Sequence, residues 1–428
     1  MTGSTSRPAT ILGAKYEAPV AHTATHLQPV APDERIHGLD LLRGWAMFGV
    51  LWSNLNDWYG TADPATRLDR ALAWMQGYLV ESRFYTLLCI LFGVGFGIQL
   101  LRASERGVDL KKTYYRRSAA LLAIGVVHGL LIWSGDILTM YALVSFALVM
   151  FRRASTKRVL LWVGIAWLVM PEIAIALRYL AGQRYMVPFV DATTRNWILG
   201  HGTWTQIASI RVGMYLDWFG RWAYVFYWDI LAMFLVGLFA LKSGFLHRVM
   251  TDPKVARRLL LWSIVAAAVG YAAAVGASKL LPVTFRGMDG WTNPRLWYRR
   301  RLIFGGSELM QIGEGLAYAA LLLLAWQTRR GARLLRPLAA TGRMALTTYL
   351  TQSVVSTLFF YGYGFRLLGS FGFTGNLVFT LVLFGCQMAL SVWWLRRFRF
   401  GPVEWLWRTL TYGSPPRMRV SEAALAAS

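Results

Sequence analysis

Long apolar segments alternate with short polar connections along most of the chain, and this pattern predicts a membrane protein built of helices. A helix needs roughly 20 apolar residues to cross the hydrocarbon core of a bilayer. About ten segments reach or approach that length. They cover residues 39–57, 84–103, 116–134, 136–151, 158–180, 222–245, 258–281, 305–327, 337–362 and 375–395. The expected fold is therefore all-α, a polytopic integral membrane protein with about ten transmembrane helices.

Basic residues gather in every second connection, which predicts how the helices are oriented. Clusters of Arg and Lys follow the second, fourth, sixth, eighth and tenth spans, within residues 102–117, 152–158, 242–258, 329–336 and 396–399. Because basic connections are retained on the cytoplasmic side, we expect both termini to be cytoplasmic. One outer connection, residues 282–304, departs from this rule because it carries five arginines. This basic outer loop is a candidate for binding an anion.

Two terminal stretches flank the apolar part of the chain. Residues 1–34 are rich in Ala, Thr, Pro and His and lack the continuous apolar core of a secretory signal peptide. We predict a disordered cytoplasmic N-terminal tail (1–34), a single transmembrane helical domain (35–413) and a flexible C-terminal tail (414–428). The connection between residues 181 and 221 is long enough for a small outer cap or an interfacial helix.

Composition supports a membrane protein and argues against a nucleic-acid partner. Of the 428 residues, 56% are hydrophobic and 15% are charged, and the 20 Trp and 19 Tyr suit the two interfaces of a bilayer. A formal net charge of +24 would suggest nucleic-acid binding in a soluble protein. Here the charge lies between apolar spans rather than in a basic domain. We therefore expect membrane lipids, and no nucleic acid, around the chain.

The glycines of FGVGFG, residues 92–97, could be mistaken for a loop that binds phosphate. No strand precedes them, and Gly93 and Gly97 have the four-residue spacing of close helix packing. We predict that they pack against another helix. The sequence contains no metal-ligand signature, Walker loop or nucleophile elbow, and no metal is expected.

Ionisable residues inside the predicted spans are the strongest functional signal, because each costs about 2.5–3.5 kcal/mol to insert and so needs a cavity or a partner. In HGLLIWSGDIL, His128 and Asp136 flank the tight turn between the third and fourth spans. As a base and its orienting carboxylate, they form the candidate catalytic or proton-relay pair. The alternatives are a core histidine bonded to a neighbouring helix and an aspartate that caps the next helix.

The first span carries Asp40 and Arg43 one turn apart, and Asn54 three turns further on. Asp40 and Arg43 are candidates for an entrance that pairs with anionic groups of a substrate. The alternative is an N-cap aspartate with Arg43 as its i+3 partner.

Two later spans carry polar stripes that need a polar surface opposite them. The candidate substrate-binding residues here are Glu308, Gln311 and Glu314 of the eighth span and Arg343, Thr347 and Gln352 of the ninth, where Thr351 extends the stripe. Hydrogen bonds between helices, without any further function, are the alternative.

Five motifs, taken in order, resemble the YeiB-like family of bacterial membrane proteins, also called domain of unknown function 418. They are LDLLRGWAMFGVLWSN from Leu39, RFYTLLCILFGVGFG from Arg83, HGLLIWSGDIL from His128, GRMALTTYL from Gly342 and FGPVEWLWRTLTYG from Phe400. The resemblance covers nearly the whole membrane part. It implies a multi-pass protein of the bacterial cytoplasmic (inner) membrane, in a family for which transport has been suggested.

The opening motif is also similar, more distantly, to the transmembrane acyltransferase superfamily, which includes the lysosomal heparan glucosaminide acetyltransferase. Those enzymes pass an acyl group from cytosolic acyl-CoA to a sugar on the far side of the membrane. The resemblance implies that Arg43 and Asn54 match the arginine and the polar residue of the first helix. YLTQ at 349–352 matches a Tyr-Leu-X-His ending with Gln352 in place of histidine. The chain departs from the superfamily because no histidine occurs between His37 and His128.

Two functions from different classes follow. The first is a transmembrane O- or N-acyltransferase that moves an acyl group from cytosolic acyl-CoA, as co-substrate, to an extracytoplasmic small-molecule or glycan acceptor. His128 would be the base, Asp136 would orient it, and Asn54 would donate to the developing oxyanion. The alternative is a proton-coupled transporter of a small polar or anionic solute, with Glu314 as a further coupling group. Either function predicts a cavity between spans one, three, four, eight and nine, and a homodimer through glycine-rich or aromatic faces is a further expectation.

Overall fold

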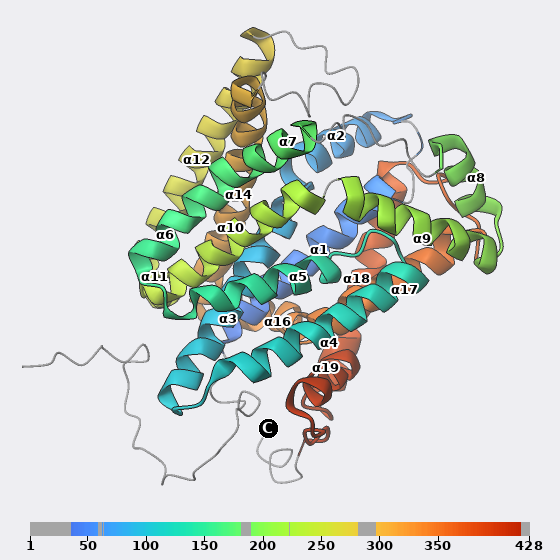
Figure 1. Cartoon of the computed structure of the whole chain (residues 1–428). Coiled ribbons are helices and arrows are strands. Elements are labelled where there is room, and N and C mark those ends of the chain that lie inside the picture. The colour runs from blue at the N-terminus through green and yellow to red at the C-terminus, as the bar shows by residue number, and fades with distance from the viewer. Residues whose placement is uncertain are drawn as a thin grey trace, which may run out of the picture.

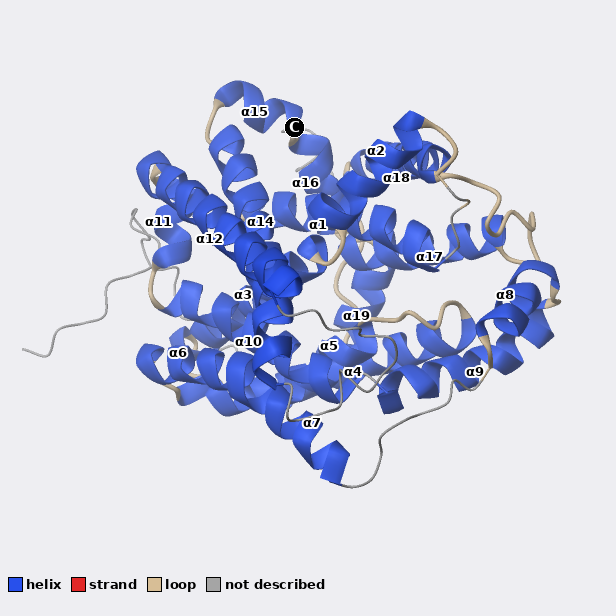
Figure 2. Cartoon of the chain, turned by 90° about the horizontal axis from the view of Figure 1, so that it is seen from above, coloured by secondary structure: helices blue, strands red, loops and turns tan. Residues whose placement is uncertain are grey.

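The computed structural model describes residues 36–58, 62, 64–180, 190–221, 223–280 and 297–420. In this part of the chain every regular element is a helix (Figures 1 and 2), apart from an isolated β-bridge between Phe398 and Arg419. The predicted all-α fold is confirmed. Six described helical stretches are long and apolar enough to cross a membrane, namely Arg67–Glu105, Thr156–Leu177, Val225–Lys242, Pro253–Lys279, Leu302–Trp326 and Phe373–Leu395. The chain is therefore a helical membrane protein.

The helices follow one another as the hydrophobic pattern leads us to expect, with several short helices between the long ones. In order they are α1 (His37–Trp58), α2 (Arg67–Met75), the π-helical turn η1 (Gln76–Val80), α3 (Arg83–Glu105), α4 (Leu110–Leu131), α5 (Leu138–Leu148), the 3-10 turn η2 (Val149–Arg153), α6 (Thr156–Gly164), the π-helical turn η3 (Ile165–Val169), α7 (Met170–Leu180), α8 (Ala192–His201), α9 (Trp204–Arg221), α10 (Ala223–Lys242), α11 (Phe245–Thr251), α12 (Pro253–Leu280), α14 (Trp297–Trp326), α15 (Arg329–Leu334), α16 (Arg336–Arg343), α17 (Ala345–Phe360), α18 (Phe373–Leu395) and α19 (Pro402–Tyr412).

In two of the predicted spans the structure has no single long helix. The fourth span contains α5, which has only 11 residues and continues as the 3-10 turn η2. The ninth span is divided at Met344, whose backbone angles are φ −112° and ψ 28°. Arg343 therefore lies on α16 and Thr347 on α17, so the predicted polar stripe does not follow one continuous helix.

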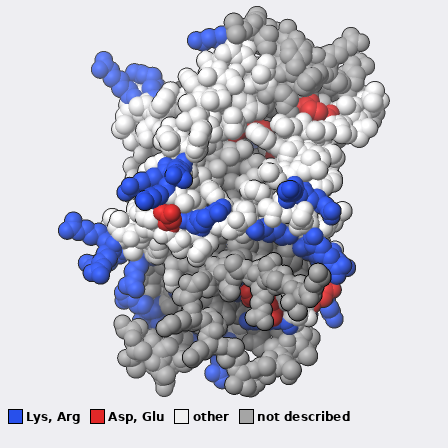
Figure 3. Space-filling view, turned by 90° about the vertical axis from the view of Figure 1, so that its left-hand side faces the viewer, with Lys and Arg blue, Asp and Glu red and all other residues white. Residues whose placement is uncertain are grey.

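Several of the connections that carry basic residues contact one another. Lys242, at the end of α10, donates from Nζ to the carbonyl of Ala154 at 2.6 Å. Gln327, after α14, donates from Nε2 to the carbonyl of Val249 at 3.1 Å. These bonds join connections that are far apart in the sequence. Figure 3, which views the left-hand side of Figure 1, shows Lys and Arg side chains outnumbering acidic ones.

Connections between other helices also contact one another. The amide of Gly362, between α17 and α18, donates to the carbonyl of Leu199 on α8 at 2.8 Å. The amide of Thr374, at the start of α18, donates to Asp69 on α2 at 3.0 Å. The predicted cap between residues 181 and 221 contains the helices α8 and α9, and residues 181–189 lie outside the described residues.

Glycines allow the central helices to approach one another closely. A Cβ atom on Gly93 of α3 would lie 1.8 Å from the carbonyl oxygen of Phe234 on α10, and one on Gly97 would lie 2.5 Å from Leu241. The prediction that these two glycines serve helix packing is confirmed. α1 and α16 meet in the same way, because a Cβ on Gly342 would lie 1.8 Å from the carbonyl oxygen of Asp40.

Parts of the predicted ends and of the basic outer loop lie outside the described residues. These parts are residues 1–35, 281–296 and 421–428. At the C-terminal end, the amide of Arg399 donates to Met418 at 2.8 Å and that of Val420 donates to Arg397 at 3.0 Å. Residues 418–420, within the predicted tail, are thus held by backbone hydrogen bonds.

Candidate functional site

A cavity of about 520 Å³ runs along α1 and α3. Its lining extends from Ile36, directly before α1, to Asn54 on α1, and from Phe84 to Arg102 on α3. At a rise of 1.5 Å per residue, 18 helical steps cover about 27 Å, close to the roughly 30 Å thickness of the hydrocarbon core. The rest of the wall comes from α4, α5, α16, α17 and α19, from Phe226 of α10, from residues 80–82 before α3, and from Gly135 and Ile137 between α4 and α5. The cavity therefore crosses most of the thickness of the membrane part.

One end of the cavity, which we name the arginine-rich end, is defined by Arg43, Arg102, Arg117, Arg343 and Arg408. The carboxylates of Asp40 and Glu404 lie among them. Nη1 of Arg43 contacts Oδ1 of Asp40 at 2.8 Å, and Asp40 is buried. The i+3 pair that the sequence suggests is thus formed, and both of its members line the cavity. The excess of guanidinium groups at this end suits a ligand with phosphate or carboxylate groups.

The helix α19 packs across the arginine-rich end. Its bounds follow from local chemistry, with Pro402 at the first helical position and Gly413, at φ 79°, directly after its end. The indole of Trp407 donates to the carbonyl of Arg117 at 2.9 Å, and the Arg117 guanidinium lies 3.7 Å from the centre of that ring system. Trp407 and Tyr412 both line the cavity. The helix therefore forms part of the wall at this end.

Glu404 on α19 caps the first turn of α17. Its Oε1 accepts the amides of Leu346 at 2.7 Å and Thr347 at 3.0 Å, and its Oε2 accepts the Thr347 hydroxyl at 2.6 Å. Burial raises the pKa of Glu404 above its usual value, against the opposing effect of the hydrogen bonds from Thr347. Thr347, a predicted substrate-binding residue, is used in this contact and does not line the cavity.

His128 and Asp136 form the pair that their positions around the turn suggest. Nδ1 of His128 lies 2.8 Å from Oδ1 of Asp136, and each residue is 1% exposed. The other oxygen of Asp136 accepts the amide of Thr139 at 2.7 Å, as in a helix cap. One side chain thus contacts the imidazole of His128 and caps the next helix.

The His128–Asp136 pair lies behind the cavity wall, because neither residue lines the cavity. Ile137 and Tyr349 do line it, and the ring centres of His128 and Tyr349 are 5.1 Å apart. Nε2 of His128 is buried and has no hydrogen-bond partner in the described part of the chain. The structure therefore does not bring this imidazole into contact with the cavity.

Sequence reasoning missed two residues that extend the pair towards α9. The hydroxyl oxygens of Thr139 and Tyr215 lie 2.7 Å apart, and both residues are buried. Tyr215 belongs to the helix between the fifth and sixth predicted spans, so nothing in the local pattern connects it to His128. Hydrogen bonds thus connect Tyr215 to the hydroxyl of Thr139, the amide of Thr139 to Asp136, and Asp136 to His128.

The three polar residues of the eighth span lie outside the cavity. No described residue of α14 lines it. Glu308 accepts a hydrogen bond from the indole of Trp167 at 2.7 Å. Glu314 accepts Nε of Arg83 at 2.5 Å, and Gln311 is half-buried on the same helix. The expected contribution of the eighth span to the cavity is thus not found, because Glu308 and Glu314 contact neighbouring helices.

Gln352 also lies in a contact between helices. Its Nε2 donates to Oε1 of Gln387 on α18 at 3.1 Å and to the carbonyl of Met47 on α1 at 3.3 Å. Gln387 in turn donates to the hydroxyl of Thr351 at 2.8 Å. Gln352 does not line the cavity, so this amide joins α1, α17 and α18 as polar residues between membrane helices often do.

The end of the cavity away from the arginines, which we name the far end, is defined by Ser53, Asn54, Glu81 and Ser82. Asn54 was predicted as a site residue, whereas Glu81 was not. The position of Glu81 offered a signal, since this carboxylate lies three residues before the second apolar span. Arg83, the partner of Glu314 that was also not predicted, follows Glu81 by two residues.

Comparison with known proteins shows the family. Residues 240–414 match the family model described as "Protein of unknown function (DUF418)". The chain is 33% identical over 415 residues to the uncharacterized protein YxaH of Bacillus subtilis (strain 168), an alignment that covers 90% of this chain and 96% of the relative. The chain belongs to the DUF418 family. It is also 29% identical over 404 residues to the uncharacterized protein YeiB of Escherichia coli (strain K12), covering 88% of this chain and 96% of the relative.

The family resemblance that the five motifs suggest is thereby confirmed. The matched region begins near the end of α10 and contains α16, α17 and α19. It therefore includes one wall of the cavity, with Arg343, Tyr349, Glu404 and Arg408. α1 and α3, which also line the cavity, lie outside the family match.

Proposed function

We propose that this DUF418 protein is a membrane-embedded, acyltransferase-like protein. It binds cytosolic acyl-CoA at the arginine-rich end of the cavity and passes the acyl group to an acceptor at the far end. The observation that carries the proposal is the length of the cavity together with its charge asymmetry. Among the described residues that line it, five arginines lie at one end and none lies at the other. A long molecule with phosphates at one end and a reactive group at the other fits such a cavity.

The chemistry of the lining supports an amphipathic anion. Arginine presents several donors in a planar fork and is suited to phosphate groups. Between the two ends the cavity is lined mainly by apolar and aromatic side chains, including Met47, Val50, Leu88, Phe92 and Met140. An acyl chain or a pantetheine arm buries apolar surface against such a wall, at about 25 cal/mol per Å².

Asn54 keeps its proposed role as a donor to the developing oxyanion, because it lines the cavity. His128 and Asp136 act on the site indirectly in this proposal. Their bond fixes the turn that carries Ile137, and the His128 ring packs beside Tyr349. Ile137 and Tyr349 form the wall, so the pair positions the wall and does not touch the substrate.

Binding of octanoyl-CoA to the purified full-length protein tests the proposal. We expect Arg102→Gln and Arg408→Gln each to weaken binding about tenfold, the loss of one charge-assisted contact worth about 1.4 kcal/mol. Arg153→Gln is the matched control, because Arg153 is exposed and does not line the cavity. The proposal fails if octanoyl-CoA does not bind, or if the control weakens binding as much as the two cavity variants.

A proton-coupled transporter of an anionic or polar solute is the second candidate. The specific observation in its favour is that the His128–Asp136 pair is buried beside a cavity that crosses most of the membrane part. Intramembrane ionisable pairs of this kind serve in proton relays. The two candidates differ in one measurement, since an acyltransferase cleaves the thioester of octanoyl-CoA and a transporter leaves it intact.

A further inference from the structure

The far end of the cavity is built around a break between two helices. The π-helical turn η1 ends at Val80, and α3 begins at Arg83. Between them Ser82 has φ 66°, a left-handed conformation that is uncommon for any residue other than glycine. Such conformations persist only where surrounding contacts impose them, and they cluster at functional sites.

Arg83 supplies those contacts from a fully buried side chain, which is 1% exposed. Its guanidinium donates to the carbonyls of Gly77 at 3.1 Å and Tyr78 at 2.7 Å, and also to that of Glu81. These carbonyls lie where the helix ends and therefore need partners from elsewhere. Nε of the same group contacts Glu314 on α14 at 2.5 Å. One arginine thus satisfies the broken helix end and anchors it to a neighbouring helix.

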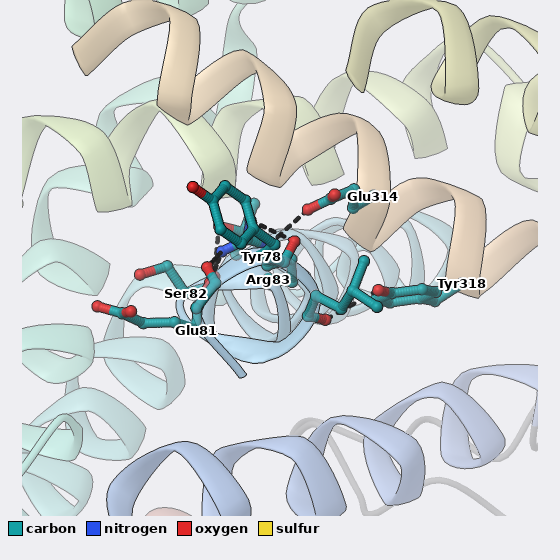
Figure 4. A network of polar contacts seen from close by, with 9 residues as sticks. Tyr78, Glu81, Ser82, Arg83, Glu314 and Tyr318 are labelled. Carbon is teal, nitrogen blue, oxygen red and sulfur yellow. Dashed lines mark hydrogen bonds and ion pairs between the residues drawn. The ribbon is translucent and has the colours of Figure 1, made fainter. Parts of the chain in front are cut away.

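A second side chain of α14 holds the same segment. The hydroxyl of Tyr318 donates to the carbonyl of Leu79 at 2.8 Å. Figure 4 shows Arg83 at the centre of this network, with Glu314 and Tyr318 on one side and Glu81 and Ser82 on the other. The anchored break therefore presents Glu81 and Ser82 away from α14, and both of them line the cavity.

Glu81 is the chemically distinctive group of the far end. Its side chain is exposed and forms no hydrogen bond or ion pair with another residue in the described part of the chain. The other members of the far end, Ser53, Asn54 and Ser82, are uncharged. A single carboxylate on an immobilised backbone is thus available at the end opposite the arginines. A carboxylate accepts hydrogen bonds and protons, and it repels anions.

We propose that the far end is the acceptor subsite and that Glu81 is a catalytic residue, which takes the proton of the acceptor's hydroxyl or amino group. This inference rests on the proposed acyl transfer. The acceptor oxygen or nitrogen forms a bond to the acyl carbon, the carbon–sulfur bond breaks, and CoA leaves as a thiolate. The acceptor proton goes to the Glu81 carboxylate, and the thiolate is protonated on release. Anionic acceptors are disfavoured, because they would approach a carboxylate.

Hydrolysis of octanoyl-CoA tests the role of Glu81 without knowledge of the natural acceptor, because water then supplies the hydroxyl. We expect Glu81→Gln to lower kcat about 100-fold, the usual effect of losing a general base, with the Kd for octanoyl-CoA unchanged. The acidic limb of the pH–rate profile should disappear in this variant, and Glu81→Asp should restore part of the rate. Glu105→Gln, an exposed position at the other end of α3, is the matched control.

The outcomes separate this inference from the proposed function. If the wild-type protein does not bind octanoyl-CoA, both are rejected. If it binds and hydrolyses octanoyl-CoA, and Glu81→Gln retains full kcat, only the role of Glu81 is rejected. A fall in both affinity and stability for Glu81→Gln also overturns it, because that result indicates a structural role.

Accessibility tests the location of Glu81 independently of any activity. The background is Cys386→Ser, in which the remaining Cys89 is buried. Glu81→Cys and Arg408→Cys are each made in this background and treated in sealed vesicles with a membrane-impermeant maleimide. We expect the two cysteines to react from opposite sides of the membrane. Reaction from the same side, or none at position 81, contradicts an acceptor subsite at the far end.

Discussion

Oδ1 of Asp136 lies 2.8 Å from Nδ1 of His128 across the turn that joins α4 to α5, and both residues are 1% exposed. Since Asp136 also accepts the amide of Thr139, a single carboxylate links the end of one helix to the start of the next. Gly125 leaves the necessary space, because a Cβ there would lie 3.0 Å from Oδ2 of Asp136 and 2.6 Å from the amide nitrogen of Thr139.

Removing this carboxylate should destabilise the α4–α5 hairpin. We expect Asp136→Ala to lower the free energy of unfolding by about 3–5 kcal/mol, because it leaves His128 and the Thr139 amide buried without an acceptor. Asp136→Asn keeps one oxygen acceptor and should cost about 1–3 kcal/mol. Denaturant titration in detergent measures both, and equal losses for Ala and Asn would contradict the hydrogen-bond account.

Close packing of α3 on α10 predicts a large difference between two neighbouring glycines. Gly93→Ala should lower the free energy of unfolding by several kcal/mol, and with it the melting temperature. The new Cβ would lie 1.8 Å from the Phe234 carbonyl oxygen, so the two helices must separate. Gly95→Ala is the control on the same helix, since the atom nearest to its Cβ is 4.0 Å away. If Gly93→Ala melts at the wild-type temperature, the two helices do not approach one another this closely.

The two members of the Arg83–Glu314 pair should contribute unequally to stability. Arg83→Met leaves the half-buried carboxylate of Glu314 and three backbone carbonyls without their donor. It should cost about 3–5 kcal/mol of unfolding free energy. Glu314→Gln keeps an oxygen that accepts Nε of Arg83 and should cost less. Chemical unfolding of both variants measures the order, and a larger loss for Glu314→Gln would show that the carbonyl contacts matter little.

The pKa of Glu404 predicts a pH dependence of stability. Burial raises this pKa above its usual value of 4.5, so the folded chain binds the proton more strongly than the unfolded chain. The stabilisation is fully present below the usual pKa and is lost as the pH rises through the raised one. We therefore expect the thermal stability of the wild-type protein to decline between about pH 4 and pH 8. In Glu404→Gln the contribution of residue 404 to this decline should be absent. An unchanged pH profile in Glu404→Gln would assign the dependence to another group.

Much of the architecture could be predicted because it depends on local pattern. Apolar segments long enough to cross the bilayer, the basic residues between them and the four-residue spacing of Gly93 and Gly97 are properties of short stretches of sequence. The helix breaks at Met344 and Ser82 were not predicted. In the second of these, Arg83 donates to the backbone carbonyls that the break exposes. Its own partner Glu314 lies 231 positions away.

The candidate site was likewise predicted only in part. The sequence paired His128 with Asp136 correctly, because only a tight turn separates them. It grouped Glu308, Glu314 and Gln352 with the cavity, whereas the structure directs these groups to Trp167, Arg83 and Gln387. A polar residue in a membrane helix must find a partner, but its position along the helix does not reveal whether that partner is a ligand or another helix.

The sequence by itself determined that this is a helical membrane protein, where its apolar segments lie, and which connections carry positive charge. These properties follow from the transfer of each segment between water and lipid, which depends on the segment alone. Only the tertiary structure decided that α1 and α3 line a cavity with arginines at one end and Glu81 at the other, and that His128 lies behind its wall. The rotation of each helix about its axis depends on packing against distant neighbours, and this rotation determines which side chains face the cavity.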